Sequence, residues 1–461
     1  MKTQKILVIA LTLVMLCGIF AGCSRNEAAS TTAPPANNPA TTAPPSNGGE
    51  DPNSTTPQGS PDVVSQGVTD DTIKIGTISL ISGAFAYIGQ PAYDGFRACI
   101  ERLNAQGGVM GRQLEIVAYD DQWDAATGKA TVERFVEQDK VFLLASLGGN
   151  IVEPSLDYLK EKKIPVINIS SGLDVCYSSN DPGGTVFQVQ PANMTDARYL
   201  IARVLHESIF GPNKDQKLPS DAKIGIVHGT DSASLNSLEY LKSFAEGEGA
   251  LDRLVMEAVA EGSVYPAAIQ KFKNENCQIV IFMGIDATTW ISSMDDAQYE
   301  VPVVFSYGAS TLQSFVPDTY KPGRPCYATV WGDYSGEAGQ NMLDDMVDAL
   351  SYLEDVPEAE QKAYRDNNYC VAGYAYGMTV VDAFERYAKY EGQYGLNWED
   401  FVTLMEIEPF TLGALSFDYM NGKRMGVDQF AFLEYVGDPA TKEEKMIALR
   451  PFETLEEVAA K

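Results

Sequence analysis

Small and polar residues follow three apolar runs of this chain, where a parallel sheet would bring them together. SGAFAYIG at 82–89 follows IKIGTISL, LGGN at 147–150 follows VFLLAS, and ISSG at 169–172 follows VINIS. Glycine allows a ligand to approach the backbone closely, and serine and asparagine offer donors suited to a carboxylate. Ligands of parallel sheets bind beyond the carboxyl ends of the strands, so these loops predict a binding site. The candidates here are Gly149, Asn150, Ser170, Ser171 and Gly172.

A second group of candidates carries negative charge or an aromatic ring. Asp231 in GTDSASLNS and Asp286 in GIDATTW follow later apolar runs and could pair with a cationic group of a ligand. For each, N-capping of the following helix is at least as good an explanation. The rings of Phe85, Tyr87 and Tyr307 could line the same cleft, although an aromatic residue more often belongs to a core.

Residues for catalysis or metal binding are scarce. His206 and His228 are the two histidines of the chain, and no G-x-S-x-G, H-E-x-x-H or P-loop motif occurs. The five cysteines after the leader are scattered singly, which is the wrong spacing for a zinc site. We expect buried thiols; one or two disulfides are the alternative in an exported protein. A net charge of −29 argues against binding to nucleic acid. We therefore expect no enzyme activity, no metal and no cofactor.

The elements that would position the candidate loops alternate between strand and helix. IKIGTISL is an apolar, β-branched run of buried-strand length. A helix is expected to begin near Pro91 and to end at Gly107 and Gly108, before the strand LEIVAYDD. Such a unit implies a parallel sheet with a right-handed crossover. The alternation starts again at KIGIVHG, near residue 223, which argues for a second doubly wound lobe.

The same stretch carries a family resemblance. The order I-K-I-G, S-G-x-x-A-x-x-G, helix, N-A-x-G-G-V-x-G-R-x-L-E and Y-D-D is similar to the amino-terminal lobe of periplasmic binding proteins of the leucine/isoleucine/valine type. The resemblance extends, more weakly, over most of residues 72–436. It implies the type I fold of that family, an α/β fold with two Rossmann-like lobes whose parallel sheets are joined by three hinge crossings. The matching residues are Ser82, Gly83, Ala86, Gly89, Asn104, Gly107, Gly108, Gly111, Arg112, Tyr119, Asp120 and Asp121.

The resemblance also implies roles for the candidates. In the family, the loops that correspond to Gly149–Asn150 and to 170–172 hold the α-carboxylate of the ligand. The second lobe departs from the family pattern, because Asp231 stands where an aromatic residue is usual. After the last strand of that lobe the family has an acidic residue that pairs with an α-ammonium group, whereas this chain has FSYG with Tyr307. Asp286 or Asp231 could supply the missing charge.

The first 62 residues resemble a leader followed by a spacer. Two lysines precede an apolar run at 6–16, which is shorter than the roughly 20 residues of a membrane span. The sequence FAGC resembles a bacterial lipobox and implies a lipidated Cys23; an ordinary signal peptide with an incidental cysteine is the alternative. The Thr-, Pro- and Asn-rich segment after it has too few apolar residues to fold. We predict a signal peptide at 1–22, a lipidated and disordered tether at 23–62, lobe 1 at 63–191 plus 332–425, and lobe 2 at 192–331 plus 426–461.

These features predict a lipid-anchored solute-binding protein on the extracytoplasmic face of a bacterial cell membrane. The resemblance implies that it serves an ABC importer, contacts permease subunits and acts as a monomer. Its expected ligand is a small polar solute, such as an amino acid or a related amide or carboxylate, and not a nucleic acid. Two alternatives are a ligand-sensing receptor domain of the same fold and an extracellular hydrolase.

Overall fold

The computed structural model describes most of the chain from residue 59 onward. The described ranges are 59–83, 86–122, 124–146, 149–169, 184–213, 215–260, 265–284, 286–308, 325–332, 334, 336–413, 415–438 and 443–461. The predictions for the leader, for Cys23 and for the tether up to residue 58 concern residues outside these ranges. Within the ranges, no helix has both the length and the apolar character that crossing a membrane requires.

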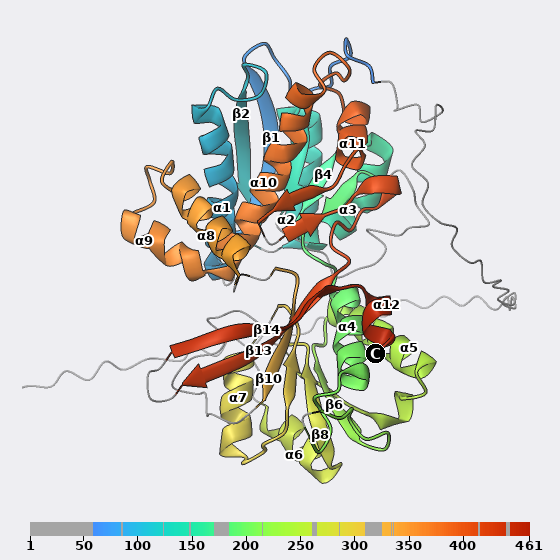
Figure 1. The fold of residues 1–461 in the computed structure, drawn as a ribbon. Coiled ribbons are helices and arrows are strands. Elements are labelled where there is room, and N and C mark those ends of the chain that lie inside the picture. The colour runs from blue at the N-terminus through green and yellow to red at the C-terminus, as the bar shows by residue number, and fades with distance from the viewer. Residues whose placement is uncertain are drawn as a thin grey trace, which may run out of the picture. The chain divides into compact units, whose positions relative to one another are not determined.

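The first lobe is built on a sheet of five parallel strands in the order β2-β1-β3-β4-β5 (Figure 1). β1 pairs in parallel with both β2 and β3. The chain therefore places β2 on one side of β1 and then crosses over to place β3 on the other side. The strands are β1 (Thr72–Ser79), β2 (Gln113–Asp120), β3 (Leu143–Ser146), β4 (Val166–Asn168) and β5 (Val186–Gln188). The predicted parallel sheet is therefore confirmed.

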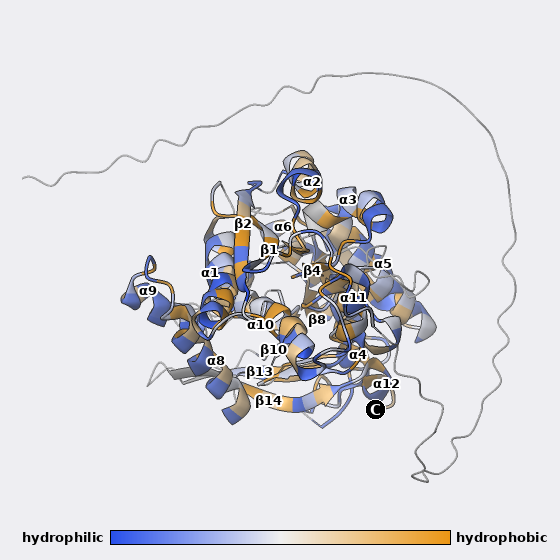
Figure 2. Cartoon of the chain, turned by 90° about the horizontal axis from the view of Figure 1, so that it is seen from above, coloured by the Kyte–Doolittle hydropathy of each residue, from blue (hydrophilic) through white to orange (hydrophobic). Residues whose placement is uncertain are grey.

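Helices cover both faces of this sheet, which explains why its strands read as continuous apolar runs. On β3, Leu143 and Ala145 join the core beneath α1 and α10, whereas Leu144 joins the core beneath α2 and α3. Figure 2 shows hydrophilic and hydrophobic residues together on α1 and on α8, as expected for helices that bury one face. The helices are α1 (Ala86–Ala105), α2 (Ala125–Arg134), a π-helical turn (Phe135–Asp139), α3 (Gly149–Lys162), α8 (Glu337–Leu350), α9 (Glu358–Ala363), α10 (Asn368–Lys389) and α11 (Trp398–Glu406).

The predicted start of α1 is wrong by five residues. The helix begins at Ala86, and Pro91 lies inside it. Pro91 is the sixth residue of the helix, so its missing N–H removes one hydrogen bond, the one that would reach the carbonyl of Tyr87. A proline so close to the start of a helix does not define the first turn.

The second lobe is built on a sheet of seven strands in the order β14-β13-β10-β9-β8-β6-β7. The five strands from β10 to β7 are parallel, and β13 and β14 add an antiparallel edge. The strands are β6 (Lys223–His228), β7 (Leu254–Ala258), β8 (Cys277–Phe282), β9 (Val303–Phe305), β10 (Cys326–Val330), β13 (Phe430–Asp438) and β14 (Glu443–Glu453). The helices are α4 (Asn193–His206), α5 (Ser232–Gly247), α6 (Pro266–Asn274), α7 (Ala287–Asp296) and α12 (Leu455–Ala459). The predicted second doubly wound lobe is therefore confirmed.

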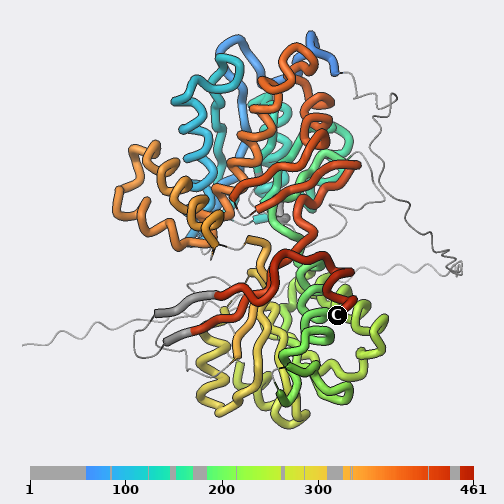
Figure 3. Tube along the Cα trace, in the orientation of Figure 1, coloured from blue at the N-terminus to red at the C-terminus, as the bar shows by residue number. Residues whose placement is uncertain are grey.

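In the described part of the chain, three segments connect the two sheets (Figure 3). They run from β5 to α4, from β10 to α8, and from β12 (Leu415–Phe417) to β13. The three predicted crossings are confirmed. The run GALSFD is strand-like, and its sequence alone predicts a place in the last crossing, which is wrong. It contains β12, which pairs with β11 (Phe410–Leu412) in a separate two-stranded sheet. β14 was not predicted, since charged residues such as Lys445 and Arg450 interrupt its apolar pattern at the sheet edge.

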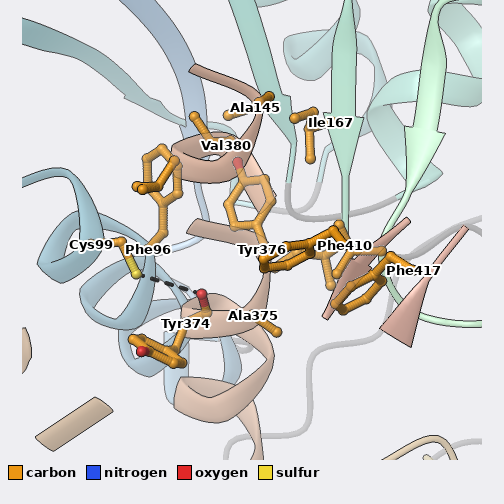
Figure 4. Close-up of a cluster of buried hydrophobic side chains, with 14 of the residues drawn as sticks. Phe96, Cys99, Ala145, Ile167, Tyr374, Ala375, Tyr376, Val380, Phe410 and Phe417 are labelled. Carbon is orange, nitrogen blue, oxygen red and sulfur yellow. Dashed lines mark hydrogen bonds between the residues drawn. The ribbon is translucent and has the colours of Figure 1, made fainter. Parts of the chain in front are cut away.

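Helices α1 and α10 approach each other so closely that only glycine fits at the contact. A Cβ on Gly95 would lie 2.3 Å from the carbonyl oxygen of Cys370, and one on Gly373 would lie 2.0 Å from that of Ala92. Figure 4 shows the adjoining core, where Phe96 stacks on Tyr376 with ring centroids 4.6 Å apart. Four cysteines are buried thiols outside any disulfide, as expected; Cys176 lies outside the described residues. The four are Cys99, Cys277, Cys326 and Cys370.

We predict that Gly95→Ala lowers the free energy of unfolding by about 1–3 kcal/mol, because the added methyl group overpacks the contact between α1 and α10. Gly247→Ala is the matched control, since a Cβ there meets nothing within 4 Å. We expect the control to be neutral or stabilising by up to about 1 kcal/mol. Urea unfolding followed by circular dichroism measures both. Equal effects of the two substitutions would contradict the close packing.

A buried ionic cluster fixes α4 to the carboxy-terminal elements. Arg203 on α4 is fully buried; its guanidinium contacts the carboxylates of Glu207, at 2.7 Å, and Glu453, and donates to the carbonyl of Phe430 at 3.1 Å. The ammonium of Lys461 lies 2.6 Å from Glu207 and 2.9 Å from Glu453. Burial acts to raise the pKa of Glu207, but the hydrogen bonds from Lys461 and Arg203 outweigh it and hold that pKa below its ordinary value. Each buried charge of the cluster thus has a partner.

Replacing Arg203 by Met should lower the free energy of unfolding by about 3–5 kcal/mol, since it leaves the buried carboxylate of Glu207 with fewer partners. Arg365→Met removes an exposed ion pair with Asp344 and should cost about 0–1 kcal/mol. Denaturant titration of both variants at neutral pH checks this difference. The interpretation fails if Arg203→Met is no more destabilising than the control.

Candidate functional site

The carboxyl ends of the parallel strands mark where each sheet can bind a ligand. In the first sheet β1 lies between β2 and β3, and in the second sheet β6 lies between β7 and β8. At such positions successive connections diverge to opposite sides, which opens a crevice at the strand ends. A pocket of about 70 Å³ lies at this end of the second sheet. It is lined by the first turns of α4 and α5 and by the loops after β8 and β9. We call it the second-lobe pocket.

Asp196, in the first turn of α4, lines this pocket and is 2% exposed. Its Oδ1 accepts a hydrogen bond from the hydroxyl of Thr329 on β10, and its Oδ2 accepts one from the backbone N–H of Tyr307 at 3.3 Å. Burial raises the pKa of Asp196 to about 7. Among the described residues no lysine or arginine forms an ion pair with it. A carboxylate has about four acceptor positions, so this one can still receive hydrogen bonds from a cationic ligand group.

Sequence reasoning missed Asp196, since it looked for acidic residues only in the loops after strands. A signal was present, because the residue lies within the apolar stripe of the helix, beside Ala197 and one turn before Leu200. A carboxylate at such a position is rarely buried without a reason. The partner Thr329 is 133 residues away in the sequence, so the pairing itself needed the structure.

Tyr307, which was a predicted site residue, lies beside Asp196 in the pocket lining. Its hydroxyl is 2.9 Å from the carbonyl oxygen of Pro191 and 2.8 Å from Oδ1 of Asn193, both of which accept hydrogen bonds. The loop after β9 is thereby attached to the start of α4 at both the backbone and the side chain of Tyr307. This attachment holds the Asp196 carboxylate and the tyrosine ring at one place.

Asp231 and Asp286 act as helix caps, as their alternative explanation predicted. Oδ1 of Asp231 accepts from the N–H of Ser234 at 2.9 Å, and Oδ1 of Asp286 accepts from the N–H of Thr289 at 3.0 Å. Both aspartates are exposed, and neither lines the second-lobe pocket. Ser234 does line it, and its hydroxyl donates to Oδ2 of Asp231 at 2.6 Å. Asp231 therefore orients a pocket hydroxyl instead of facing the pocket itself.

Three of the first-lobe candidates, Tyr87, Gly149 and Asn150, lie at the corresponding end of the first sheet. Gly149 and Asn150 open α3 directly after β3, so the N-terminus of this helix lies beyond the carboxyl end of a strand next to β1. Backbone N–H groups at such a position favour a carboxylate. Tyr87 is exposed in the first turn of α1, and its ring contacts Tyr369 edge-on at 6.2 Å. Four predicted site residues lie outside the described residues, namely Phe85, Ser170, Ser171 and Gly172.

The histidines and acidic groups of the described residues form no metal centre. Nε2 of His206 lies 3.2 Å from Glu248, and Nδ1 of His228 lies 2.8 Å from the carbonyl oxygen of Gly229. No group of three His, Cys, Asp or Glu side chains in the described ranges could hold a metal ion. The polar groups at the carboxyl ends of the strands are suited to hydrogen-bonding a small ligand.

Comparisons with known proteins agree with the α/β fold of the two lobes. A family model described as periplasmic binding protein matches residues 72–413. The leucine-specific-binding protein of Salmonella typhimurium is 30% identical over 105 residues, which cover 23% of this chain but only 28% of that relative. The Leu/Ile/Val-binding protein of Escherichia coli is 27% identical over 321 residues, or 62% of this chain and 83% of the relative. A branched-chain amino acid ABC transporter structure from Thermus thermophilus with bound valine has a TM-score of 0.66 at 13% identity, covering 86% of this chain and 100% of that one.

Proposed function

This chain belongs to the periplasmic binding protein family, and on that premise we propose that it is an extracytoplasmic solute-binding protein of an ABC importer. Its ligand is a small polar solute, an amino acid or a related amide or carboxylate. The relatives and the structural neighbour named above are binding or transport proteins whose names refer to leucine, isoleucine and valine. The proposal assigns the chain no catalytic reaction.

The observation that carries the proposal is the buried carboxylate of Asp196 at the second-lobe pocket. Hydrogen bonds from Thr329 and Tyr307 occupy two of its acceptor positions, and the remaining ones are available to an ammonium group. Burying a carboxylate that has no cationic partner costs free energy. A cationic ligand group that pairs with Asp196 offsets this cost, which favours binding. Asp196 thereby replaces the acidic residue that is missing after β9.

The first lobe provides the complementary half of the proposed site. The N-terminus of α3, with Gly149 and Asn150, offers backbone N–H groups to the carboxylate of the same solute. A ligand that contacts both lobes favours the closed arrangement through its differential affinity for that state. A dissociation constant in the micromolar range corresponds to about −8 kcal/mol, which several buried hydrogen bonds can supply.

The remaining parts of the proposal follow from the leader and the family. Lipid attachment at Cys23 would hold a monomer at the outer side of the membrane, where the closed form would meet permease subunits. The ligand-sensing alternative uses the same fold and pocket, and differs in the partner. Co-purification with a permease, or with a membrane sensor, distinguishes the two roles.

Isothermal titration with amino acids, short amides and carboxylates that lack an amino group tests the proposed function. We expect an amino acid or a related solute to bind with a micromolar dissociation constant. Asp196→Asn should weaken binding of that solute by about 2–5 kcal/mol, because it removes one member of a buried charge pair. Asp286→Asn is the control; asparagine caps a helix about as well as aspartate does, so both stability and affinity should stay unchanged. Failure of every solute class to bind would reject the function, and native affinity in Asp196→Asn would reject the role of Asp196.

Binding of an ammonium-bearing solute should strengthen as the pH rises to about 7 and then level off. Because the pKa of Asp196 is raised to about 7, the carboxyl group is largely protonated below that pH. Binding must then displace a proton at a cost of about 1.4 kcal/mol per pH unit. We expect the dissociation constant to fall about tenfold per unit between pH 5 and pH 7, and to be independent of pH in Asp196→Asn. A flat profile for the native protein would contradict the assignment.

The same raised pKa has a consequence for the ligand-free protein. Between pH 3.8, the ordinary pKa of the group, and about pH 7, the folded state holds the Asp196 proton more tightly than the unfolded state. The contribution of this group to the free energy of unfolding therefore decreases as the pH rises through that window. The difference in free energy of unfolding between native protein and Asp196→Asn, measured at pH 4.5 and pH 7.5, should reveal this decrease.

A further inference from the structure

A second and larger cavity, of about 350 Å³, lies beside a different face of α4. Thr195, Arg198 and Tyr199 line it, whereas the second-lobe pocket uses Asp196 and Leu200 from the same helix. At about 100° per residue the centres of these two sets are roughly 130° apart around the helix. The other walls are residues 421–428 of the third crossing and residues 454–456 at the start of α12. We call it the hinge cavity; its volume is that of a small-molecule site.

Arg198 brings a positive charge to the hinge cavity. Its guanidinium lies over the ring of Tyr240 at 5.5 Å, and its Nε is buried without a hydrogen-bond partner. Among the described residues no carboxylate forms an ion pair with it. The other two cations of the lining are occupied: Lys423 pairs with Asp418 at 2.5 Å, and Arg424 pairs with Glu406 at 2.7 Å. Arg198 is thus the lining cation, among the described residues, that is available to an anion.

The rest of the lining determines what kind of anion fits. Met425, Val427 and Leu455 supply apolar surface, and Val427 is 5% exposed. Asp428 and Glu456 also line the cavity and disfavour a highly charged anion; the carboxylate of Asp428 lies 3.8 Å from the ammonium of Lys423. A single carboxylate attached to an aliphatic or aromatic body suits this mixture, because Arg binds carboxylates bidentately and the body covers apolar side chains.

The hinge cavity is lined by α4 of the second lobe and by the third crossing, and a movement of the lobes would shift these two segments relative to each other. The backbone of the third crossing is hydrogen-bonded to the last strand of the first sheet, since Gln188 donates to the carbonyl of Arg424 at 2.7 Å and accepts from the N–H of Gly426 at 3.2 Å. On the other side, the hydroxyl of Tyr199 on α4 donates to the carbonyl of Asp428 at 2.6 Å. A molecule bound against both is sensitive to any rotation about this crossing.

We propose that the hinge cavity is a second binding site, which takes a small organic monocarboxylate through Arg198, and that its occupancy changes the affinity of the second-lobe pocket for its solute. The first half stands on the cavity alone, and the second half rests on the proposed function. Coupling between two sites is reciprocal, so the solute must change the affinity for the carboxylate by the same factor.

Benzoate and hexanoate are the probes, titrated by calorimetry into the purified full chain and its variants. We expect one or both to bind, and Arg198→Met to raise the dissociation constant at least tenfold, which is about 1.4 kcal/mol. Arg198→Lys keeps the positive charge but loses the bidentate guanidinium group, so its dissociation constant should lie between those of the native protein and Arg198→Met. Arg365→Met, at an exposed ion pair elsewhere, should bind as the native protein does. Thermal unfolding of each variant shows that the fold is kept.

Three binding results and one labelling result would overturn the proposal. The first is no binding of either probe to the native protein at 10 mM, a concentration chosen to be about ten times a millimolar dissociation constant. The second is equal affinity in Arg198→Met. The third is loss of probe binding in Asp196→Asn, which would place the probe in the second-lobe pocket. A photoreactive benzoate derivative should label peptides that contain residues 421–428 or 454–456, and labelling confined to other segments would also count against the site.

The failure of this proposal and the failure of the proposed function are distinguishable. If no solute binds at the second-lobe pocket but benzoate still requires Arg198, the hinge cavity is a site while the importer function is rejected. If a solute binds and benzoate does not, the reverse holds. If the solute and benzoate both bind, equal shifts of the two dissociation constants support the coupling between the sites. If each binds with an affinity that the other does not change, the proposed coupling is wrong.

Discussion

The buried guanidinium of Arg203 is the constraint on which both candidate sites depend. It fixes the carboxy-terminal half of α4 to Glu453 and to the carbonyl of Phe430, at the ends of β14 and β13. α4 in turn presents Asp196 on one side and Arg198 on another. Breaking a buried ion pair costs far more than an exposed one, so this helix cannot shift alone. The buried charge of Arg203 therefore sets the positions of Asp196 at the second-lobe pocket and of Arg198 at the hinge cavity, although Arg203 itself lines neither cavity.

The architecture was predictable because its signals are local. β1, α1 and β2 follow from a buried apolar run, a helical stripe and the paired glycines that end the helix. Parallel pairing follows from the length of the connection between strands. The errors also have local causes: Pro91 lies within the helix instead of at its first turn, and the charged residues of β14 hide an edge strand. These errors move boundaries and add an edge strand but do not alter the topology.

The candidate site was less predictable because its key contact is not local. Asp231 and Asp286 were chosen for their place after strands, and each side chain turned out to be committed to its own helix. Asp196 acquires its character from Thr329 and from burial beneath the loop of Tyr307, neither of which a window of sequence displays. Tyr307 lines the pocket because a residue that closely follows a strand stays at the sheet edge whatever else it contacts.

The contact between α1 and α10 has a consequence for how the chain reaches this structure. The thiol of Cys99 and the carbonyl of Tyr374 that accepts its hydrogen bond are 275 residues apart. The second sheet is likewise closed by β13 and β14, which come after the whole of α10. During synthesis from the amino terminus, neither lobe can complete its core until most of the chain has emerged. Contacts of such sequence separation slow folding, so the packing of both lobes depends on segments that are synthesised late.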